Sequence, residues 1–144
     1  MSTEENKALS RQVRETMDAG ELAAFDEYVA PDAVFHIAGN PAPLGREEMR
    51  GLLEVFYSAF PDLQHTFEDQ IAEGDKVVTR ITFRGTHRGE FQGIPPTGNE
   101  VAFPALDIDR FEDGKIVEHW ANLDNLGLMQ QLGVIPPPEQ SEEA

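Results

Sequence analysis

Two carboxylates and one imidazole lie close together on a segment near the end of the chain that is predicted to fold as a β-hairpin. Asp107 and Asp109 belong to the run VAFPALDIDRF, and His119 belongs to KIVEHW after a Glu-Asp-Gly turn. A carboxylate beside an imidazole is suited to general acid–base catalysis, because it fixes the tautomer and orientation of the ring. We therefore take Asp107 and His119 as the candidate catalytic pair. The alternative is a cross-strand charge pair that only stabilises the hairpin, by up to about 1 kcal/mol.

The turn type decides which side chains of this hairpin share a face. A three-residue loop over residues 112–114 places Asp107 directly opposite His119, whereas a two-residue loop puts these side chains on opposite faces. We favour the three-residue loop because it gathers small and polar residues on a single face, as expected of a cavity wall. That face carries Phe103, Ala105, Asp107, Asp109, Val117, His119 and Ala121, and the other face carries Leu106, Ile108, Ile116 and Trp120 beside Glu118.

Substrate-binding positions are expected on several elements around this cavity. The candidates are Phe56, Phe103, Asp109, Ala121, His36 and Arg80. For His36 a surface or core position is the alternative, and for Arg80 the alternative is an exposed position. Nothing in the sequence around His65 and His87 distinguishes them from solvated histidines. No HxH or HExxH spacing and no phosphate-binding glycine motif is present, so we expect neither a metal nor a cofactor.

The helices that must position these residues are predicted for the first half of the chain. Ser2 and Glu5 have capping-box spacing before apolar residues at intervals of four, which predicts a first helix that ends at Gly20. A second short helix is expected before Pro31. The clearest helix begins at Arg46, carries its apolar stripe on Met49, Leu52, Leu53, Phe56 and Phe60, and ends before Pro61.

The strands are predicted mainly for the second half, where apolar residues alternate. After a short strand over residues 33–37, strands are expected over residues 63–72, 76–84, 101–111 and 115–122, followed by a last helix capped by Asp124. This order predicts an α+β fold in which a curled antiparallel sheet has its helices packed on one face. Residues 89–98 are the loop expected to gate the pocket.

Composition narrows the functional classes. The chain has 144 residues, a net charge of −16 and no cysteine, so it offers no thiolate chemistry and no basic surface for nucleic acid or anionic membranes. We expect a single domain over residues 1–135, a disordered acidic tail over residues 136–144 and a cytoplasmic location. The apolar outer face of the sheet must be covered, which predicts a homo-oligomer, most simply a dimer formed sheet to sheet.

Three segments resemble the SnoaL-like polyketide cyclases, a branch of the NTF2-like fold group. They are GTHRGEFQGIPPTG at residues 85–98, the hairpin DIDRFEDGKIVEHW and LDNLGLMQQLG at residues 123–133, within a resemblance that spans residues 8–134. The resemblance implies a cone-shaped barrel whose curved sheet wraps around a hydrophobic pocket closed by helices. It also implies closure of a ring in a polyketide ester by intramolecular aldol condensation, with a carboxylate as base and no metal or cofactor.

One departure from the family pattern concerns the base itself. The catalytic aspartate of the cyclases lies two residues after the histidine that matches His119, and that position here is Ala121. A second polar pocket position, a histidine in the cyclases, falls on Asp107. The resemblance therefore implies either that Asp107 has taken over the role of base or that the protein binds a ligand without catalysis. An epoxide-hydrolase-like activity on the same fold is a further alternative.

Overall fold

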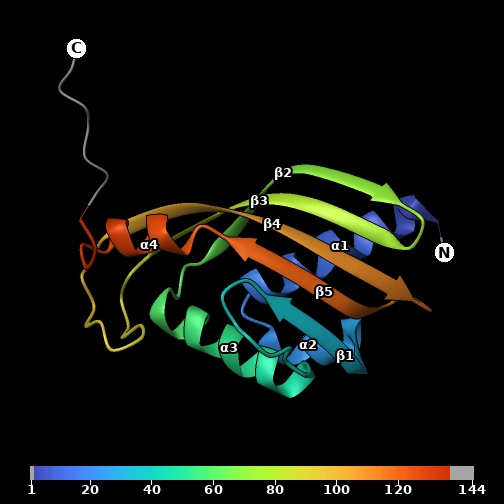
Figure 1. The fold of residues 1–144 in the computed structure, drawn as a ribbon, viewed down its shortest axis with the longest axis horizontal. Coiled ribbons are helices and arrows are strands. Elements are labelled where there is room, and N and C mark those ends of the chain that lie inside the picture. Colours follow the sequence, from blue (N-terminus) through green and yellow to red (C-terminus); the bar gives the residue numbers. More distant parts are fainter. Residues whose placement is uncertain (1, 137–144) are drawn as a thin grey trace, which may run out of the picture.

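Four helices and five strands build the part of the chain that the computed structural model describes, residues 2–136 (Figure 1). The expected tail lies outside the described residues, apart from Pro136. In chain order the elements are α1 (Thr3–Asp18), a 3-10 turn (Leu22–Ala24), α2 (Phe25–Tyr28), β1 (Val29–Ile37), α3 (Arg46–Ala59), β2 (Gln64–Glu73), β3 (Lys76–Thr86), β4 (Glu100–Glu112), β5 (Lys115–Leu123) and α4 (Asn125–Gln131).

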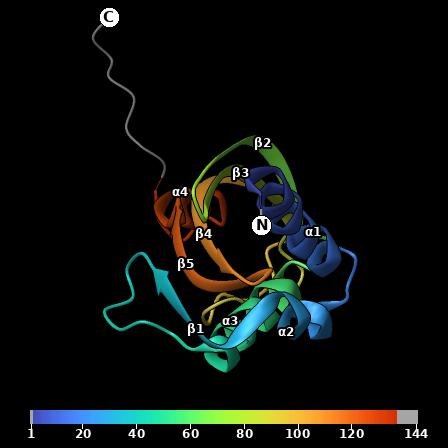
Figure 2. The same ribbon diagram turned by 90° about the vertical axis from the view of Figure 1, so that its right-hand side faces the viewer.

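The strands form one sheet in the order β1-β5-β4-β3-β2. Strands β2 to β5 pair antiparallel, as predicted, but β1 adds to β5 in parallel and makes the sheet mixed. Figure 2 shows the sheet as an arc that runs from β2 to β1, with α1 and α3 closing its open side. The predicted α+β class, a curved sheet with helices packed over its concave face, is confirmed.

The N-terminal helices are fixed by the caps that the sequence predicts. In α1 the Ser2 hydroxyl accepts from the Glu5 amide at 3.1 Å, and the Glu5 carboxylate accepts from the Ser2 amide at 3.1 Å. The inner face of this helix buries two apolar and three polar residues, Asn6, Ser10, Val13, Arg14 and Met17. Helix α1 therefore brings polar groups as well as apolar ones to the sheet.

The β4–β5 hairpin differs from the prediction in its turn. Asp113 and Gly114 form a two-residue turn with φ of +50° and +77°, which is the left-handed backbone a type I′ hairpin turn requires. A β-bulge follows, because Arg110 pairs with Glu118 while the next residue, Phe111, pairs with Ile116. The predicted register was wrong by two residues up to the bulge and by one residue between the bulge and the turn. The shift of one residue moves Ile116, expected outside, to the inner face, where it is buried in the core.

Away from the turn, beyond the bulge, the shift is even, so the inward and outward sets there are preserved, but their partners change. Asp107 lies opposite Ala121 rather than His119, and Asp109 lies opposite His119. The alternation of exposure along β4 places Phe103, Asp107 and Asp109 on the buried face. A shift of two residues along a strand keeps each side chain on its face while moving it by one pair position.

The loop between β3 and β4 is anchored to the end of α3. The amides of Arg88 and Gly89 both donate to the Ala59 carbonyl, at 2.9 and 3.0 Å. Phe91 is fully buried and packs against Phe56 and Phe60.

None of the helices within residues 2–136 combines the length and the apolar character needed to cross a membrane.

Candidate functional site

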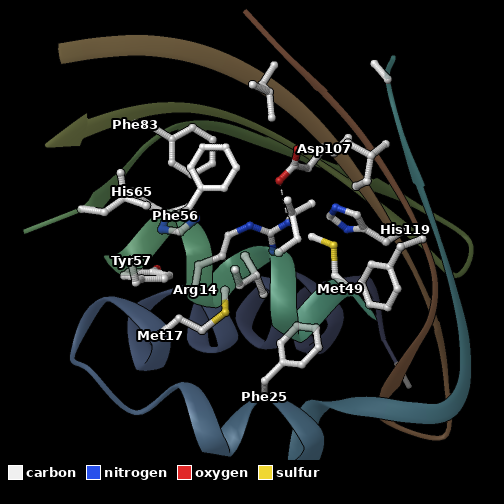
Figure 3. A pocket seen from close by; sticks show the side chains of 18 of the residues that line it. Arg14, Met17, Phe25, Met49, Phe56, Tyr57, His65, Phe83, Asp107 and His119 are labelled. Carbon is white, nitrogen blue, oxygen red and sulfur yellow. Dashed lines mark hydrogen bonds and ion pairs between the residues drawn. The ribbon is translucent and has the colours of Figure 1, made fainter. Parts of the chain in front are cut away.

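A cavity of about 340 Å³ lies on the concave side of the sheet, beneath α1 and α3 (Figure 3). This volume is in the range of small-molecule sites. Its walls are mainly apolar and aromatic and include Met17, Phe25, Phe35, Met49, Phe56, Phe83 and Phe103. Exposed lining residues mark its mouth: Gly39 and Asn40 after β1, Gln92 in the β3–β4 loop, and Asn125 at the start of α4. Among residues 89–98, the loop expected to gate the pocket, only Gln92 lines the cavity.

Arg14 of α1 forms a buried ion cluster with both carboxylates of β4. Its Nη1 donates to Asp109 Oδ2 at 2.8 Å, and its Nη2 donates to Asp107 Oδ2 at 3.0 Å. Ser10, one helical turn earlier, donates its hydroxyl to Asp109 Oδ2 at 2.8 Å. Arg14 is 4% exposed and Asp109 1% exposed, so their mutual attraction acts with little screening by water.

The imidazole of His119 pairs with Asp109, not with Asp107 as predicted. His119 Nδ1 lies 2.6 Å from Asp109 Oδ1, because the observed register makes these residues cross-strand neighbours. A hydrogen bond from Nδ1 to the carboxylate leaves Nε2 as the reactive nitrogen. Within residues 2–136, Nε2 has no hydrogen-bond partner, and it is not fully buried. His119 lines the cavity. The pair is therefore a carboxylate–imidazole dyad that faces the cavity.

The protonation states of the cluster follow from its geometry. Burial alone would raise the pKa of Asp109, but the charge of Arg14 and the hydrogen bond from His119 outweigh it and hold that pKa well below its usual value. Burial alone would likewise lower the pKa of Arg14, and the charges of Asp109 and Asp107 raise it instead. Asp109 is thus a fixed anion that orients His119 and Arg14.

Asp107 is the more exposed of the two carboxylates of the cluster that line the cavity. Its side chain is 9% exposed, against 1% for Asp109, and it lines the cavity wall (Figure 3). Arg14 binds its Oδ2, while its Oδ1 has no partner among the described residues and is not among their fully buried unpaired atoms. Because Asp107 lies directly opposite Ala121, its carboxylate occupies space beside a position that has only a methyl group.

A second polar group at the cavity was missed by sequence reasoning. Asp18 Oδ1 accepts from the Tyr57 hydroxyl at 2.7 Å and lies 2.8 Å from His65 Nδ1. Asp18 Oδ2 accepts from the His65 backbone amide at 2.7 Å. Burial and the hydrogen bond to Asp18 raise the pKa of the Tyr57 phenol well above its usual value. Tyr57 and His65 line the same cavity as His119.

Two of the six expected substrate-binding residues do not reach this cavity. His36 stacks on Trp120 with ring centroids 5.4 Å apart and lies 2.7 Å from Glu118 on the outer face, because its neighbour Phe35 takes the inner position. Arg80 is also on the outer face, where its half-exposed side chain pairs with Asp69 at 2.7 Å. The other four, Phe56, Phe103, Asp109 and Ala121, line the cavity, and their role in substrate binding stays a prediction.

Comparison with known proteins gives consistent matches in sequence and structure. A family model described as SnoaL-like polyketide cyclase matches residues 7–132. The aklanonic acid methyl ester cyclase DnrD of Streptomyces peucetius is 33% identical over 115 residues, which cover 78% of this chain and 77% of DnrD. The nogalonic acid methyl ester cyclase of Streptomyces nogalater is 29% identical over 123 residues, which cover 81% of this chain and 88% of that protein.

Two solved structures extend the comparison. AclR, a candidate hydroxylase from Streptomyces galilaeus, superposes with a TM-score of 0.89 at 35% identity, over 96% of this chain and 87% of AclR. IdmH, a candidate polyketide cyclase from Streptomyces antibioticus, superposes with a TM-score of 0.80 at 38% identity, over 90% of this chain and 99% of IdmH.

Proposed function

The chain belongs to the SnoaL-like polyketide cyclase family, and from this premise we propose that it closes a ring in a hydrophobic polyketide ester by intramolecular aldol condensation. The observation that carries the proposal is the pairing of Asp107 with Ala121. Ala121 holds the position where the family resemblance places the catalytic aspartate. Opposite residues of an antiparallel pair have Cβ atoms about 5 Å apart, so a carboxylate on Asp107 serves the same part of the cavity.

In the proposed reaction Asp107 Oδ1 removes the acidic proton between two carbonyl groups of the substrate. The resulting enolate carbon bonds to the carbon of a ketone in the same molecule. The π electron pair of that ketone moves to its oxygen, which takes a proton and becomes a hydroxyl. The cavity contributes by holding the two carbons in contact, which supplies much of the acceleration. Arg14 keeps the Asp107 carboxylate in one orientation.

His119 is proposed to bind the same end of the substrate. Asp109 accepts from Nδ1, so Nε2 is free to accept a hydrogen bond from an enol or phenol hydroxyl. This assignment keeps His119 in the site, but its partner is Asp109, and its task is to position the enol next to Asp107. All of these groups come from the chain itself, and we propose that the reaction needs no cofactor. The predicted cytoplasmic location stays a prediction.

Turnover of polyketide methyl esters tests the proposal. We expect the protein, dialysed against a chelator, to convert aklanonic or nogalonic acid methyl ester into a product of unchanged mass and altered retention. A relative named after each ester serves as the positive control. Binding of either ester without any conversion would reject the cyclase and support a non-catalytic binding protein. A product that gains one oxygen atom would also reject it, in favour of a hydroxylase as AclR is described.

A hydrolase is the second candidate, because of one specific observation. Epoxide hydrolases of this fold are expected to flank an arginine with two carboxylates, and Arg14 lies between Asp107 and Asp109 at 3.0 and 2.8 Å. In such a reaction a carboxylate takes a proton from water, whose oxygen bonds to an epoxide carbon as the ring carbon–oxygen bond breaks, and the released ring oxygen takes up a proton to become a hydroxyl. The same mass measurement with an epoxide substrate distinguishes this activity, because its product gains one water molecule.

We further propose that a second copy of the chain covers the outer face of the sheet. Cross-strand pairs place Ile71, Val78, Ile108 and Trp120 in one continuous apolar row over four strands, with His36 at its end. Ile71 is 68% exposed and the neighbouring Leu106 51% exposed. A two-fold axis through such a row brings it against its own copy and removes the apolar surface from water.

A further inference from the structure

The cavity contains a second carboxylate–imidazole dyad, on the side away from the first. Asp18 and His65 repeat the arrangement of Asp109 and His119, with Nδ1 to carboxylate distances of 2.8 and 2.6 Å. Figure 3 shows His65 beside Phe83 and His119 beside Met49, with Arg14 between the two rings in this view. Both histidines line the one cavity.

The Asp18 dyad is built more rigidly than a surface ion pair. Asp18 is 8% exposed and His65 5% exposed in their side chains, and the Asp18 carboxylate binds the ring, the backbone amide of His65 and the Tyr57 hydroxyl. The His65 ring packs on Phe83 with centroids 4.7 Å apart. Three elements, α1, α3 and β2, thus converge to fix one imidazole.

The orientation of His65 leaves Nε2 for the cavity. Nδ1 is hydrogen-bonded to Asp18. Within residues 2–136, Nε2 has no hydrogen-bond partner, and it is not fully buried. The charged and titratable groups that face His65 are Asp18 and Arg14 from α1 and Tyr57 from α3, while the paired position on β3 is the apolar Phe83. In its protonated form the ring carries a hydrogen on Nε2 as well as on Nδ1, and the Nε2 hydrogen can be donated to a bound substrate.

We propose that His65 is the general acid of the ring closure, an inference that rests on the cyclase proposed above. Asp107 takes the carbon-bound proton at one end of the substrate, and the electron pair displaced by carbon–carbon bond formation moves to the ketone oxygen. The bond from hydrogen to His65 Nε2 breaks as that oxygen becomes a hydroxyl. The protein then holds one proton more on Asp107 and one fewer on His65, and solvent restores both. Asp18 and Tyr57 are positioning residues.

The test compares His65→Gln with His36→Gln as the matched control on the outer face. With aklanonic acid methyl ester we expect His65→Gln to lower kcat about 100-fold or more with little change in KM. We also expect it to abolish the decline of kcat at high pH, where the wild type loses the acid proton. Asp18→Asn should reduce kcat less than His65→Gln and keep a decline at high pH, because the imidazole remains in the cavity.

Unchanged kcat and an unchanged pH profile in His65→Gln, beside an active wild type, would overturn the inference and leave the cyclase intact. A wild type that closes no ring would overturn both. If His65→Gln fails to fold, ¹⁵N-histidine spectra of the wild type decide. The ester should shift the His65 Nε2 resonance and leave that of His36 in place, and an unmoved His65 signal would overturn the inference.

Discussion

At the scale of single residues, Arg14 is the group on which the site depends, because it neutralises two buried carboxylates. Replacing it with methionine leaves Asp107 and Asp109 without their cation, and removal of one partner from a buried ion pair typically costs about 3–5 kcal/mol. We expect Arg14→Met to lower the free energy of unfolding by about that amount in urea titrations. Arg11→Met is the control, since Arg11 is half exposed and pairs with Glu15 on the same helix. An equal loss in both variants would contradict the buried cluster.

Acid stability provides a second test at this scale. The folded-state pKa of Asp109 is lowered, so its contribution to stability is complete above the unfolded pKa of about 3.9 and is lost as pH falls toward the folded value. We expect the unfolding midpoint of the wild type to drop more between pH 6 and about pH 3 than that of Asp109→Asn. Asp69→Asn, in an exposed pair, should keep the wild-type acid dependence. Parallel curves for wild type and Asp109→Asn would refute the depressed pKa.

The sequence allowed part of this site to be predicted. The predicted and the observed registers differ by two residues at these positions, so both place Asp107, Asp109 and His119 on one face. Their common location therefore followed from alternation along the strands. Arg14 follows Ser10 by four residues and precedes Met17 by three, which puts it on the apolar face of α1. That spacing was a usable signal. Asp18 and His65 meet only through the packing of α1 on β2, and no local pattern reports such a long-range contact.

At the scale of elements, the β3–β4 loop packs closely against the end of α3 at Gly89, where there is no room for a side chain. A Cβ on Gly89 would collide with the Ser58 carbonyl oxygen at the end of α3. We expect Gly89→Ala to destabilise the protein by about 1–3 kcal/mol, because the loop must move and lose its bonds to Ala59. The readout is the midpoint of thermal unfolding. A loop that is free to gate the pocket would instead tolerate the methyl group.

At Gly51, in the adjacent helix α3, we expect an alanine to have the opposite effect on stability. Gly51 lies in the interior of α3, and apart from its chain neighbours and the backbone of the helix itself, no heavy atom of the described residues comes within 4 Å of an added Cβ. Gly51→Ala should stabilise the protein by about 0.5–1 kcal/mol, since alanine has the higher helix propensity and restricts the unfolded chain. A destabilised Gly51→Ala in the same thermal measurement would show that the helix face is not free there.

The β4–β5 hairpin shows which features of an element the sequence predicts and which it does not. The strand limits and, except for Ile116 beside the bulge, the two faces followed from alternation, and the last helix begins after Asp124 as expected. The Glu-Asp-Gly turn is compatible with two loop lengths, and the bulge that accompanies the shorter one leaves no mark in the residue types. The cross-strand partners therefore had to come from the structure.

At the scale of the whole molecule, the apolar outer face predicts self-association. We expect the wild type to have twice the mass of one chain in light scattering. Leu106→Asp, which puts a charge on the exposed centre of this face, should shift the equilibrium to the monomer. Val55→Asp is the control, because Val55 is 45% exposed on α3, away from this face. A monomeric wild type, or equal effects of both variants, would reject the sheet-to-sheet dimer.

The architecture as a whole was predictable from the order of helices and alternating strands, with one exception. The pairing of β1 with β5 is parallel and joins segments about eighty residues apart, as in Phe35 with His119. A single alternating segment carries no information about the direction of its neighbour, so the sheet was expected to be antiparallel throughout. Addition of β1 nevertheless closes the cavity wall beside His119. Phe35 packs there on the imidazole, with the two ring centroids 5.4 Å apart.

The most direct test of the account moves the carboxylate across the hairpin. With aklanonic acid methyl ester, Asp107→Ala should lose about 100-fold or more in kcat. The double variant Asp107→Ala with Ala121→Asp should recover a substantial part of it, because residues 107 and 121 are opposite each other. Full activity in Asp107→Ala would contradict the account, and so would a double variant that folds and binds the ester but remains as inactive as Asp107→Ala.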